Sequence, residues 1–131
     1  MLKGIVEGRL RKIQRQIAER ILLEDSFKVI KRVAGFDLAF KDDVAFVVGV
    51  ILDYKTLKVE ELRHSRMKLF FPYIPTMLAF REAPPIIRVY KEFELKPDLT
   101  LINGHGIAHP YFCGIASVSY THLTLPTTER V

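Results

Sequence analysis

Residues 33–52 read VAGFDLAFKDDVAFVVGVIL, and this stretch decides the fold. Its first part alternates with a period of two, which predicts a strand over residues 29–40 with four residues on one face: Val33, Gly35, Asp37 and Ala39. The Lys-Asp-Asp at residues 41–43 predicts a turn. Residues 44–52 are apolar throughout, which is typical of a central strand buried on both faces. The stretch therefore predicts two neighbouring strands joined by a short turn.

The segments on either side extend this sheet. A turn at residues 53–56 precedes a more polar strand over residues 57–67, whose charges favour a position near the sheet edge. Upstream, an amphipathic helix is predicted over residues 3–24, with apolar side chains every three or four positions: Val6, Leu10, Ile13, Ile17 and Ile21. Three strands with short connections predict an antiparallel meander preceded by a helix.

The second half of the chain predicts helix followed by one more strand. Thr76 is a suitable helix N-cap. Pro84 and Pro85 predict either a break in the helix or a second helix that starts at a proline and runs to about Leu95. A short fourth strand is expected over residues 99–102. Helix, meander, helices and a strand together predict an α/β fold with a mixed sheet.

The composition excludes several classes of protein. The chain has 131 residues, 49% of them hydrophobic and 27% charged, with one cysteine, which excludes a disordered chain and a disulfide scaffold. It contains no run of about 18 apolar residues and no signal peptide, so a soluble, cytoplasmic protein is expected. Residues 1–32 carry 9 basic and 4 acidic side chains, within a net charge of +5. This segment is either a phosphate-contacting surface or a solvated helix face.

Asp37 lies in mid-strand between Gly35 and Ala39, where a carboxylate requires compensation. The small neighbours leave room for a metal ion or a phosphate; the alternative is an aspartate that points to water. Asn103 follows the last predicted strand and would lie beside Asp37 if the first and fourth strands were neighbours. Its amide oxygen can ligate a hard cation, or the residue can form a turn before Gly104.

Three further residues are candidates for function. Glu82, in AFREA, is an exposed helix residue when read without context. Tyr73 is held between two prolines, where its ring either stacks on bases or covers the core. His109 follows an open glycine-rich loop and suits acid–base chemistry or phosphate contact. A zinc site made with His105 and Cys113 would lack a fourth ligand.

Three motifs occur in order: GFDLAF at 35–40, FPYIPTMLAFREAPP at 71–85 and NGHGIAHP at 103–110. In sequence and spacing they resemble the endonuclease V (deoxyinosine 3′-endonuclease) family over about residues 1–117. The resemblance implies an RNase H-like mixed sheet, a three-strand antiparallel meander plus a parallel strand, with flanking helices, here truncated. It also implies phosphodiester hydrolysis that depends on Mg²⁺, with Mn²⁺ as a substitute ion.

The resemblance assigns catalytic and metal-binding roles to individual residues. Asp37 and Glu82 match the family's metal carboxylates, and His109 matches the histidine near the scissile phosphate, so these three are the catalytic candidates. Asn103 occupies the third metal position, where the family usually has aspartate. Because an amide carries no charge, this departure should weaken Mg²⁺ binding.

The resemblance also implies a nucleic-acid site and a domain boundary. Tyr73 matches the wedge that enters the duplex when the deaminated base is everted, and Gly104 and Gly106 match the loop that encloses that base. The match stops at Ser117. We therefore expect an incomplete endonuclease V-like domain over residues 1–117, followed by a foreign or disordered tail over residues 118–131.

The implied function is cleavage of the second phosphodiester bond 3′ to deoxyinosine, as part of DNA repair. The expected partner is DNA containing deoxyinosine, bound by a monomer, and the truncated chain itself is expected to lack full activity. Two alternatives stay open: an inosine-specific ribonuclease acting on RNA, and an RNase H-like domain that binds nucleic acid without cutting it. Asn103 favours the non-catalytic alternative, whereas Asp37 and Glu82 together favour the enzyme.

Overall fold

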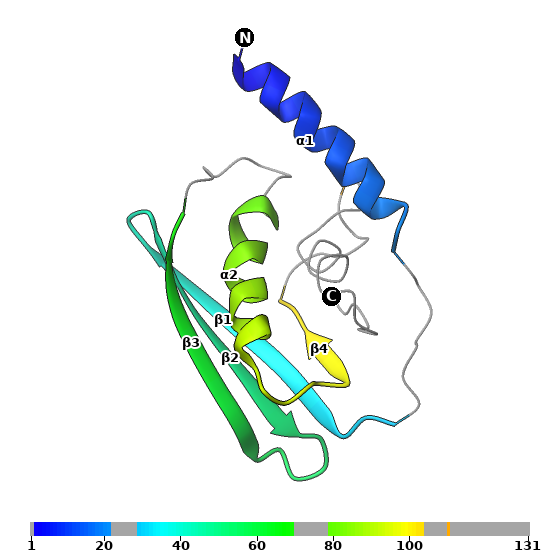
Figure 1. Ribbon diagram of the computed structural model, residues 1–131, viewed down its shortest axis with the longest axis vertical. Coiled ribbons are helices and arrows are strands. Elements are labelled where there is room, and N and C mark those ends of the chain that lie inside the picture. Colours follow the sequence, from blue (N-terminus) through cyan, green and yellow to red (C-terminus); the bar gives the residue numbers. More distant parts are fainter. Residues whose placement is uncertain (1, 22–28, 70–78, 104–109, 111–131) are drawn as a thin grey trace.

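The computed structural model describes residues 2–21, 29–69, 79–103 and 110. Its elements, in chain order, are α1 (Leu2–Ala18), β1 (Arg32–Lys41), β2 (Val44–Asp53), β3 (Val59–Lys68), α2 (Ala79–Glu92) and β4 (Leu99–Leu101). The strands form one sheet in the order β3-β2-β1-β4 (Figure 1). The pairs β1–β2 and β2–β3 are antiparallel, and β4 is parallel to β1. The predicted meander and mixed sheet are confirmed, with the polar strand β3 at one edge.

The two hairpin turns form where the sequence predicts them. Asp42 turns the chain from β1 into β2 with a φ of 54°, in the left-handed region that aspartate tolerates. In the second turn, Asp53 Oδ1 accepts hydrogen bonds from the backbone N–H groups of Thr56 at 2.8 Å and Lys55 at 3.0 Å. These bonds lower the pKa of Asp53, with the bond from Thr56 the largest cause.

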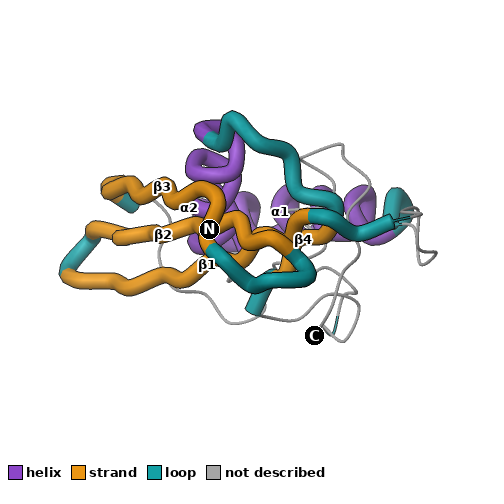
Figure 2. The backbone as a smooth tube through the Cα atoms, turned by 90° about the horizontal axis from the view of Figure 1, so that it is seen from below, coloured by secondary structure: helices purple, strands orange, loops and turns teal. Residues whose placement is uncertain are grey.

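The central strand β2 is not buried on both faces, contrary to the sequence prediction. Ala45, Val47 and Ile51 are fully buried, but Phe46 and Val48 remain 42% and 41% exposed. The reason is that α2 packs on the face that carries Val47, as the two views in Figures 1 and 2 show. The unbroken apolar run of β2 therefore leaves hydrophobic side chains exposed on the other face.

Helix α2 runs through Pro84 and Pro85 without the predicted break. A proline inside a helix removes one backbone hydrogen bond and costs about 3 kcal/mol. Packing offsets this cost here, because Pro85 is fully buried together with Ala83 and Ile86 on the side of α2 that meets the core. The periodic apolar stripe of α2 therefore outweighs the local preference of the two prolines.

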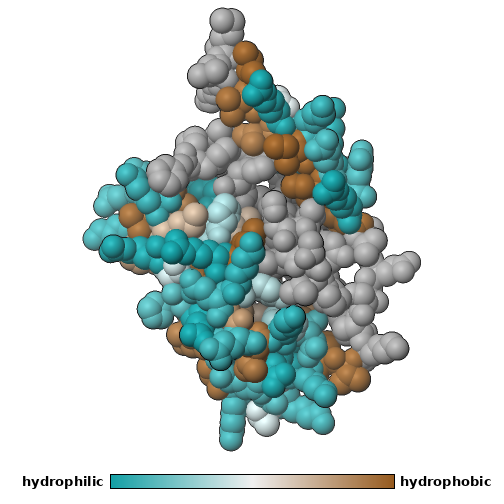
Figure 3. All heavy atoms as spheres, in the orientation of Figure 1, coloured by the Kyte–Doolittle hydropathy of each residue, from teal (hydrophilic) through white to brown (hydrophobic). Residues whose placement is uncertain are grey.

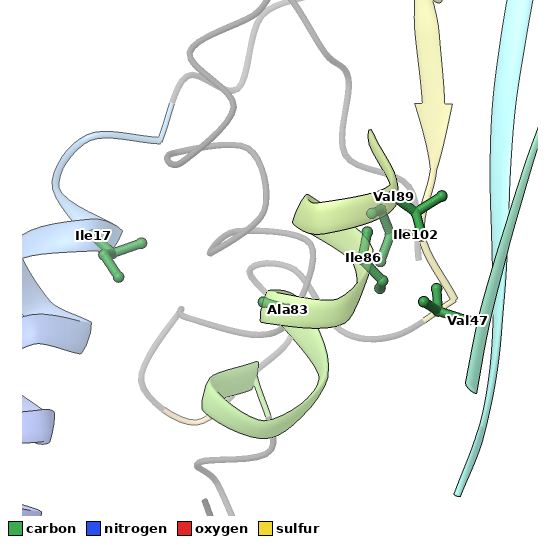
Figure 4. Packing of buried hydrophobic residues seen from close by; sticks show 6 residues of the cluster. All are labelled: Ile17, Val47, Ala83, Ile86, Val89 and Ile102. Atoms are coloured by element: carbon green, nitrogen blue, oxygen red, sulfur yellow. The ribbon is translucent and has the colours of Figure 1, made fainter. Parts of the chain in front are cut away.

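The core lies between α2, the sheet and the C-terminal end of α1. Its buried side chains come from α1, β2, α2 and the residue after β4 (Figure 4): Ile17, Val47, Ala83, Ile86, Val89 and Ile102. Helix α1 is shorter than predicted, and part of its apolar stripe faces solvent, since Val6 and Ile13 are 45% and 41% exposed. Figure 3 shows hydrophobic side chains on the surface along α1.

Candidate metal centre

Asp37 lies in the middle of β1 and is exposed. Its Oδ1 accepts a hydrogen bond from the backbone N–H of Leu38 at 3.0 Å. Asp37 therefore needs no compensation for burial, and the alternative of an aspartate that points to water describes the structure. Its neighbours on the strand explain this: Phe36 and Leu38 pack against the core beneath α2, so the alternation of the strand turns Asp37 to the opposite face.

A cavity of about 350 Å³ opens on this outer face of the sheet. Asp37 is paired with Val48 of β2, which is paired in turn with His64 of β3, so these three side chains form one row across the sheet. The cavity is lined by Asp37, Leu38, Ala39, Phe46, Val47, Val48, His64, Ser65 and Arg66. The space that the small residue Ala39 was expected to leave beside Asp37 is therefore present.

Asn103 follows β4, which is the parallel neighbour of β1 that the sequence argument required. The register pairs Gly35 with Leu101, where β4 ends, and Asn103 lies two residues further on, in a bend. Asn103 is exposed, and so is Leu101, whereas Ile102 belongs to the core. Leu101 therefore lies on the outer face of the sheet, the face that carries Asp37, and the alternation of exposure over residues 101–103 favours the same face for Asn103.

Glu82 lies in the first described turn of α2 and is partly buried. It precedes Ile86 by four residues and Val89 by seven, so it shares the helix face that packs on the sheet. Burial raises the pKa of Glu82, and the neighbouring positive charge of Arg81 opposes this shift. The Arg81 guanidinium carbon lies 5.2 Å from the ring centroid of Phe40, which places this end of α2 near the C-terminal end of β1.

The carboxylates of Asp37 and Glu82 therefore approach β1 from different faces of the sheet. Within the described residues, no group of three or more histidine, cysteine, aspartate or glutamate side chains is placed to hold a metal ion. Because β4 ends at Leu101, opposite Gly35, the part of β1 beyond Gly35 has no described strand on that side. Convergence of Asp37 and Glu82 on one ion remains a prediction.

Four candidate residues fall outside the described part of the chain. They are Tyr73, Gly104, Gly106 and His109. Their roles likewise remain predictions.

The sequence reasoning missed two residues that share the cavity with Asp37. His64 and Arg66 lie two positions apart on β3 and line the outer face. Strand alternation could have found them: once β3 is placed next to β2, every second residue of β3 lies on one face. What the sequence alone did not supply was the register between β2 and β3.

Comparison with known proteins identifies the family. The family model for endonuclease V matches residues 15–128. The chain belongs to the endonuclease V family. The matched range extends past residue 117, and the expected domain boundary at that point remains a prediction.

Two curated relatives are each about twice as long as the region that this chain matches. The chain is 42% identical over 106 residues to the endonuclease V of Dictyoglomus thermophilum, a match covering 81% of this chain and 46% of that protein. It is 40% identical over 107 residues to the endonuclease V of Roseiflexus sp., covering 82% and 48%. The chain therefore spans about half the length of the curated relatives it matches.

Solved endonuclease V structures confirm the RNase H-like fold of this part. The structure from Streptomyces avermitilis aligns with a TM-score of 0.86 at 33% identity, covering 94% of this chain and 56% of that one. The Ciona intestinalis endonuclease V aligns with a TM-score of 0.83 at 28% identity, covering 97% and 57%. That protein was crystallised with a DNA 24mer containing an inosine followed by a ribo-adenosine.

Neither described helix of this endonuclease V family member has the length and apolar character needed to cross a membrane.

Proposed function

We propose that the complete protein is a Mg²⁺-dependent endonuclease V of DNA repair. It would be a cytoplasmic monomer that hydrolyses the second phosphodiester bond 3′ to deoxyinosine. Family membership supports the reaction class, and the Ciona intestinalis complex with inosine-containing DNA supports the substrate. The parallel pairing of β1 with β4 supports the proposal most directly for this chain, because it makes neighbours of the strand that carries Asp37 and the strand that precedes Asn103.

The chemistry of the donor set fits Mg²⁺, with Mn²⁺ as a substitute. Asp37 and Glu82 offer carboxylate oxygens and Asn103 offers an amide oxygen, which are the hard ligands that Mg²⁺ takes. Asp37 is exposed and so available to an ion, and burial of Glu82 favours a partner of opposite charge for its ionised form. When bound, the ion would activate water and stabilise charge on the phosphate.

The remaining roles concern the nucleic acid. Tyr73 would open the stack beside the lesion, Gly104 and Gly106 would enclose the everted base, and His109 would contact the scissile phosphate. Eversion exposes the edge of the purine, on which recognition of the deaminated base depends. The support for these four roles is the match of each residue to its family motif.

The test needs a full-length version of the protein. We define this version as residues 1–117 joined in alignment to the remaining C-terminal part of the Dictyoglomus thermophilum relative. It should cleave a deoxyinosine duplex in Mg²⁺, and should leave an undamaged duplex uncut. An inosine-containing RNA of the same sequence tests the ribonuclease alternative. Loss of cleavage on chelation of the metal, with recovery on re-addition, is also expected.

A second function is favoured by one observation, the amide at position 103. If Asn103 does not support metal binding, the protein would bind inosine-containing nucleic acid without cutting it. Tight binding of the deoxyinosine duplex with no cleavage in Mg²⁺ or Mn²⁺ would support this alternative and contradict the nuclease.

A further inference from the structure

Strand β4 is the shortest strand of the sheet, and it depends on few pairs for its position. Only three of its residues pair with β1, at Val33–Leu99, Ala34–Thr100 and Gly35–Leu101. A slip of one residue in such a pairing would turn every following side chain to the other face of the sheet. Burial of Leu99, Thr100 and Ile102 favours the observed register. Because the ladder itself is short, a further interaction at its start would add to that preference.

Asp98 supplies such an interaction directly before β4. Its Oδ2 accepts hydrogen bonds from the backbone N–H groups of Lys31 at 2.8 Å and Arg32 at 3.0 Å. Its own backbone N–H donates to the carbonyl oxygen of Arg32 at 2.9 Å. Three hydrogen bonds therefore join one residue at the start of β4 to the start of β1, and the two bonds to the carboxylate are charge-assisted.

The connection between α2 and β4 has a second contact, with the edge strand β3 on the other side of the sheet. Glu61 of β3 accepts hydrogen bonds from the backbone N–H groups of Glu94 and Leu95 at 2.9–3.1 Å. The six-residue connection between α2 and β4 is thus fixed near its beginning by Glu61 and at its end by Asp98. The Phe93 ring at the start of the connection also packs against Phe36 of β1. Of the two hydrogen-bonded contacts, that of Asp98 joins the backbone of β1 directly before β4, so it bears on which residues of the two strands lie opposite one another.

We propose that Asp98 is a positioning residue that fixes the register of β4 on β1 and thereby holds Asn103 beside Asp37. Asn103 lies five positions after Asp98, and extended chain rises about 3.3 Å per residue, so the contact acts over about 16 Å of chain. The first half of the proposal concerns the fold alone. The second half rests on the proposed function, because it assumes a metal ion at Asp37 and Asn103.

The test compares two aspartates that accept the same kind of bond. Asp98→Ala removes the acceptor next to β4, and Asp98→Asn keeps an oxygen acceptor without the charge. Asp53→Ala is the matched control, since Asp53, the last residue of β2, also accepts two backbone N–H bonds but takes them from the β2–β3 turn, on the side of β1 away from β4. All variants are made in the full-length version. The measurements are amide hydrogen exchange of β4, Mg²⁺ binding by calorimetry, and melting temperature.

Asp98→Ala should lower the exchange protection of β4 by about tenfold or more, because it removes two charge-assisted hydrogen bonds. It should also weaken Mg²⁺ binding by about tenfold or more, as expected for a group that orients a metal ligand. Asp98→Asn should retain most of the exchange protection of β4 and most of the Mg²⁺ affinity. Asp53→Ala should lower the melting temperature to a similar extent with unchanged β4 protection and Mg²⁺ affinity.

Unchanged β4 protection in Asp98→Ala would overturn the proposal. Equal loss of Mg²⁺ affinity in Asp98→Ala and Asp53→Ala would overturn its second half, because general destabilisation would then account for the effect. If the unmodified protein binds no Mg²⁺, the proposed function fails, while the exchange data still decide the register.

Discussion

Gly49 of β2 lies directly against Val89 of α2. A Cβ atom at Gly49 would lie 2.8 Å from Val89 Cγ1 and 2.8 Å from Phe36 Cε1, closer than carbon atoms can approach. The Phe93 ring lies at a similar distance, 2.9 Å from the same point. The absence of a side chain at position 49 therefore sets how closely α2 packs on the sheet, and with it the position of Glu82 on that helix.

Replacement of this glycine should destabilise the fold. Gly49→Ala should lower the free energy of unfolding by about 1–3 kcal/mol, the usual cost of adding atoms to a well-packed core. Gly35→Ala is the control, because a Cβ at Gly35 would have no atom within 4 Å. Chemical denaturation of both variants measures the difference. Equal stability of the two variants would contradict this packing.

The sheet could be predicted from the sequence because its signals are local. Alternation in residues 33–40, an aspartate-rich turn and the long apolar run of β2 give the meander without further information. The continuous helix through Pro84 and Pro85 could not be predicted in the same way. Proline acts on its own turn, whereas the compensating burial of Pro85 depends on contacts that only the folded chain provides.

The candidate site could be predicted in its residues but not in their arrangement. The motifs gave Asp37, Glu82 and Asn103, and the neighbouring strand positions of Asp37 and Asn103 follow from a mixed sheet. The exposure of Asp37 did not follow, because periodicity assigns a residue to a face without saying what covers that face. His64 and Arg66 of the same cavity depend on the register between β2 and β3.

Protonation of Glu82 should change stability in the metal-free protein. Since burial raises its pKa in the folded state, the folded protein holds its proton to a higher pH than the unfolded chain does. The Glu82 carboxyl therefore lowers the free energy of unfolding once the pH exceeds its unfolded pKa of about 4.5. This destabilisation is complete above the pKa of Glu82 in the folded protein. Glu82→Gln should raise the melting temperature at pH 7 and leave it nearly unchanged at pH 4.

The control for Glu82 is Glu92→Gln at the exposed C-terminal end of the same helix. Melting temperatures of both variants between pH 4 and pH 8 give the comparison. A gain at pH 7 that persists undiminished at pH 4 would show that ionisation of Glu82 is not its cause.

Asp37→Ala should abolish Mg²⁺-dependent cleavage in the full-length version. A bound metal contributes several kcal/mol of transition-state stabilisation, and each 1.4 kcal/mol is tenfold in rate, so a loss of about 100-fold or more is expected. The exposed carboxylate contributes little to stability, so the melting temperature should stay nearly constant. Asp43→Ala in the β1–β2 turn removes an equally exposed aspartate and should cut at the normal rate. Undiminished cleavage by Asp37→Ala would remove Asp37 from the metal site.

Asn103→Asp should strengthen Mg²⁺ binding in the full-length version. A negative charge about 4 Å from a divalent cation contributes about 2 kcal/mol even at the dielectric constant of water, whereas an amide offers only a dipole. The Mg²⁺ concentration for half-maximal rate should therefore fall by about tenfold or more. Gln16→Glu adds the same charge on the exposed face of α1 and should have little effect. If both variants behave alike, Asn103 does not contact the metal.

Tyr73→Ala should weaken binding to a deoxyinosine duplex far more than binding to a single strand with the same lesion. A wedge is useful where a stack must be opened, because its ring fills the gap left by the everted base and offsets an unstacking cost of a few kcal/mol. That cost is largely absent in a single strand.

Two control variants accompany Tyr73→Ala. Tyr73→Phe keeps the ring and should retain duplex affinity. Tyr54→Ala, at a tyrosine that is 50% exposed in the β2–β3 turn, should change neither the duplex nor the single-strand affinity. A core role for Tyr73 would instead lower the melting temperature and reduce both affinities equally. Two dissociation constants and a melting temperature for each variant therefore separate the wedge from the core residue.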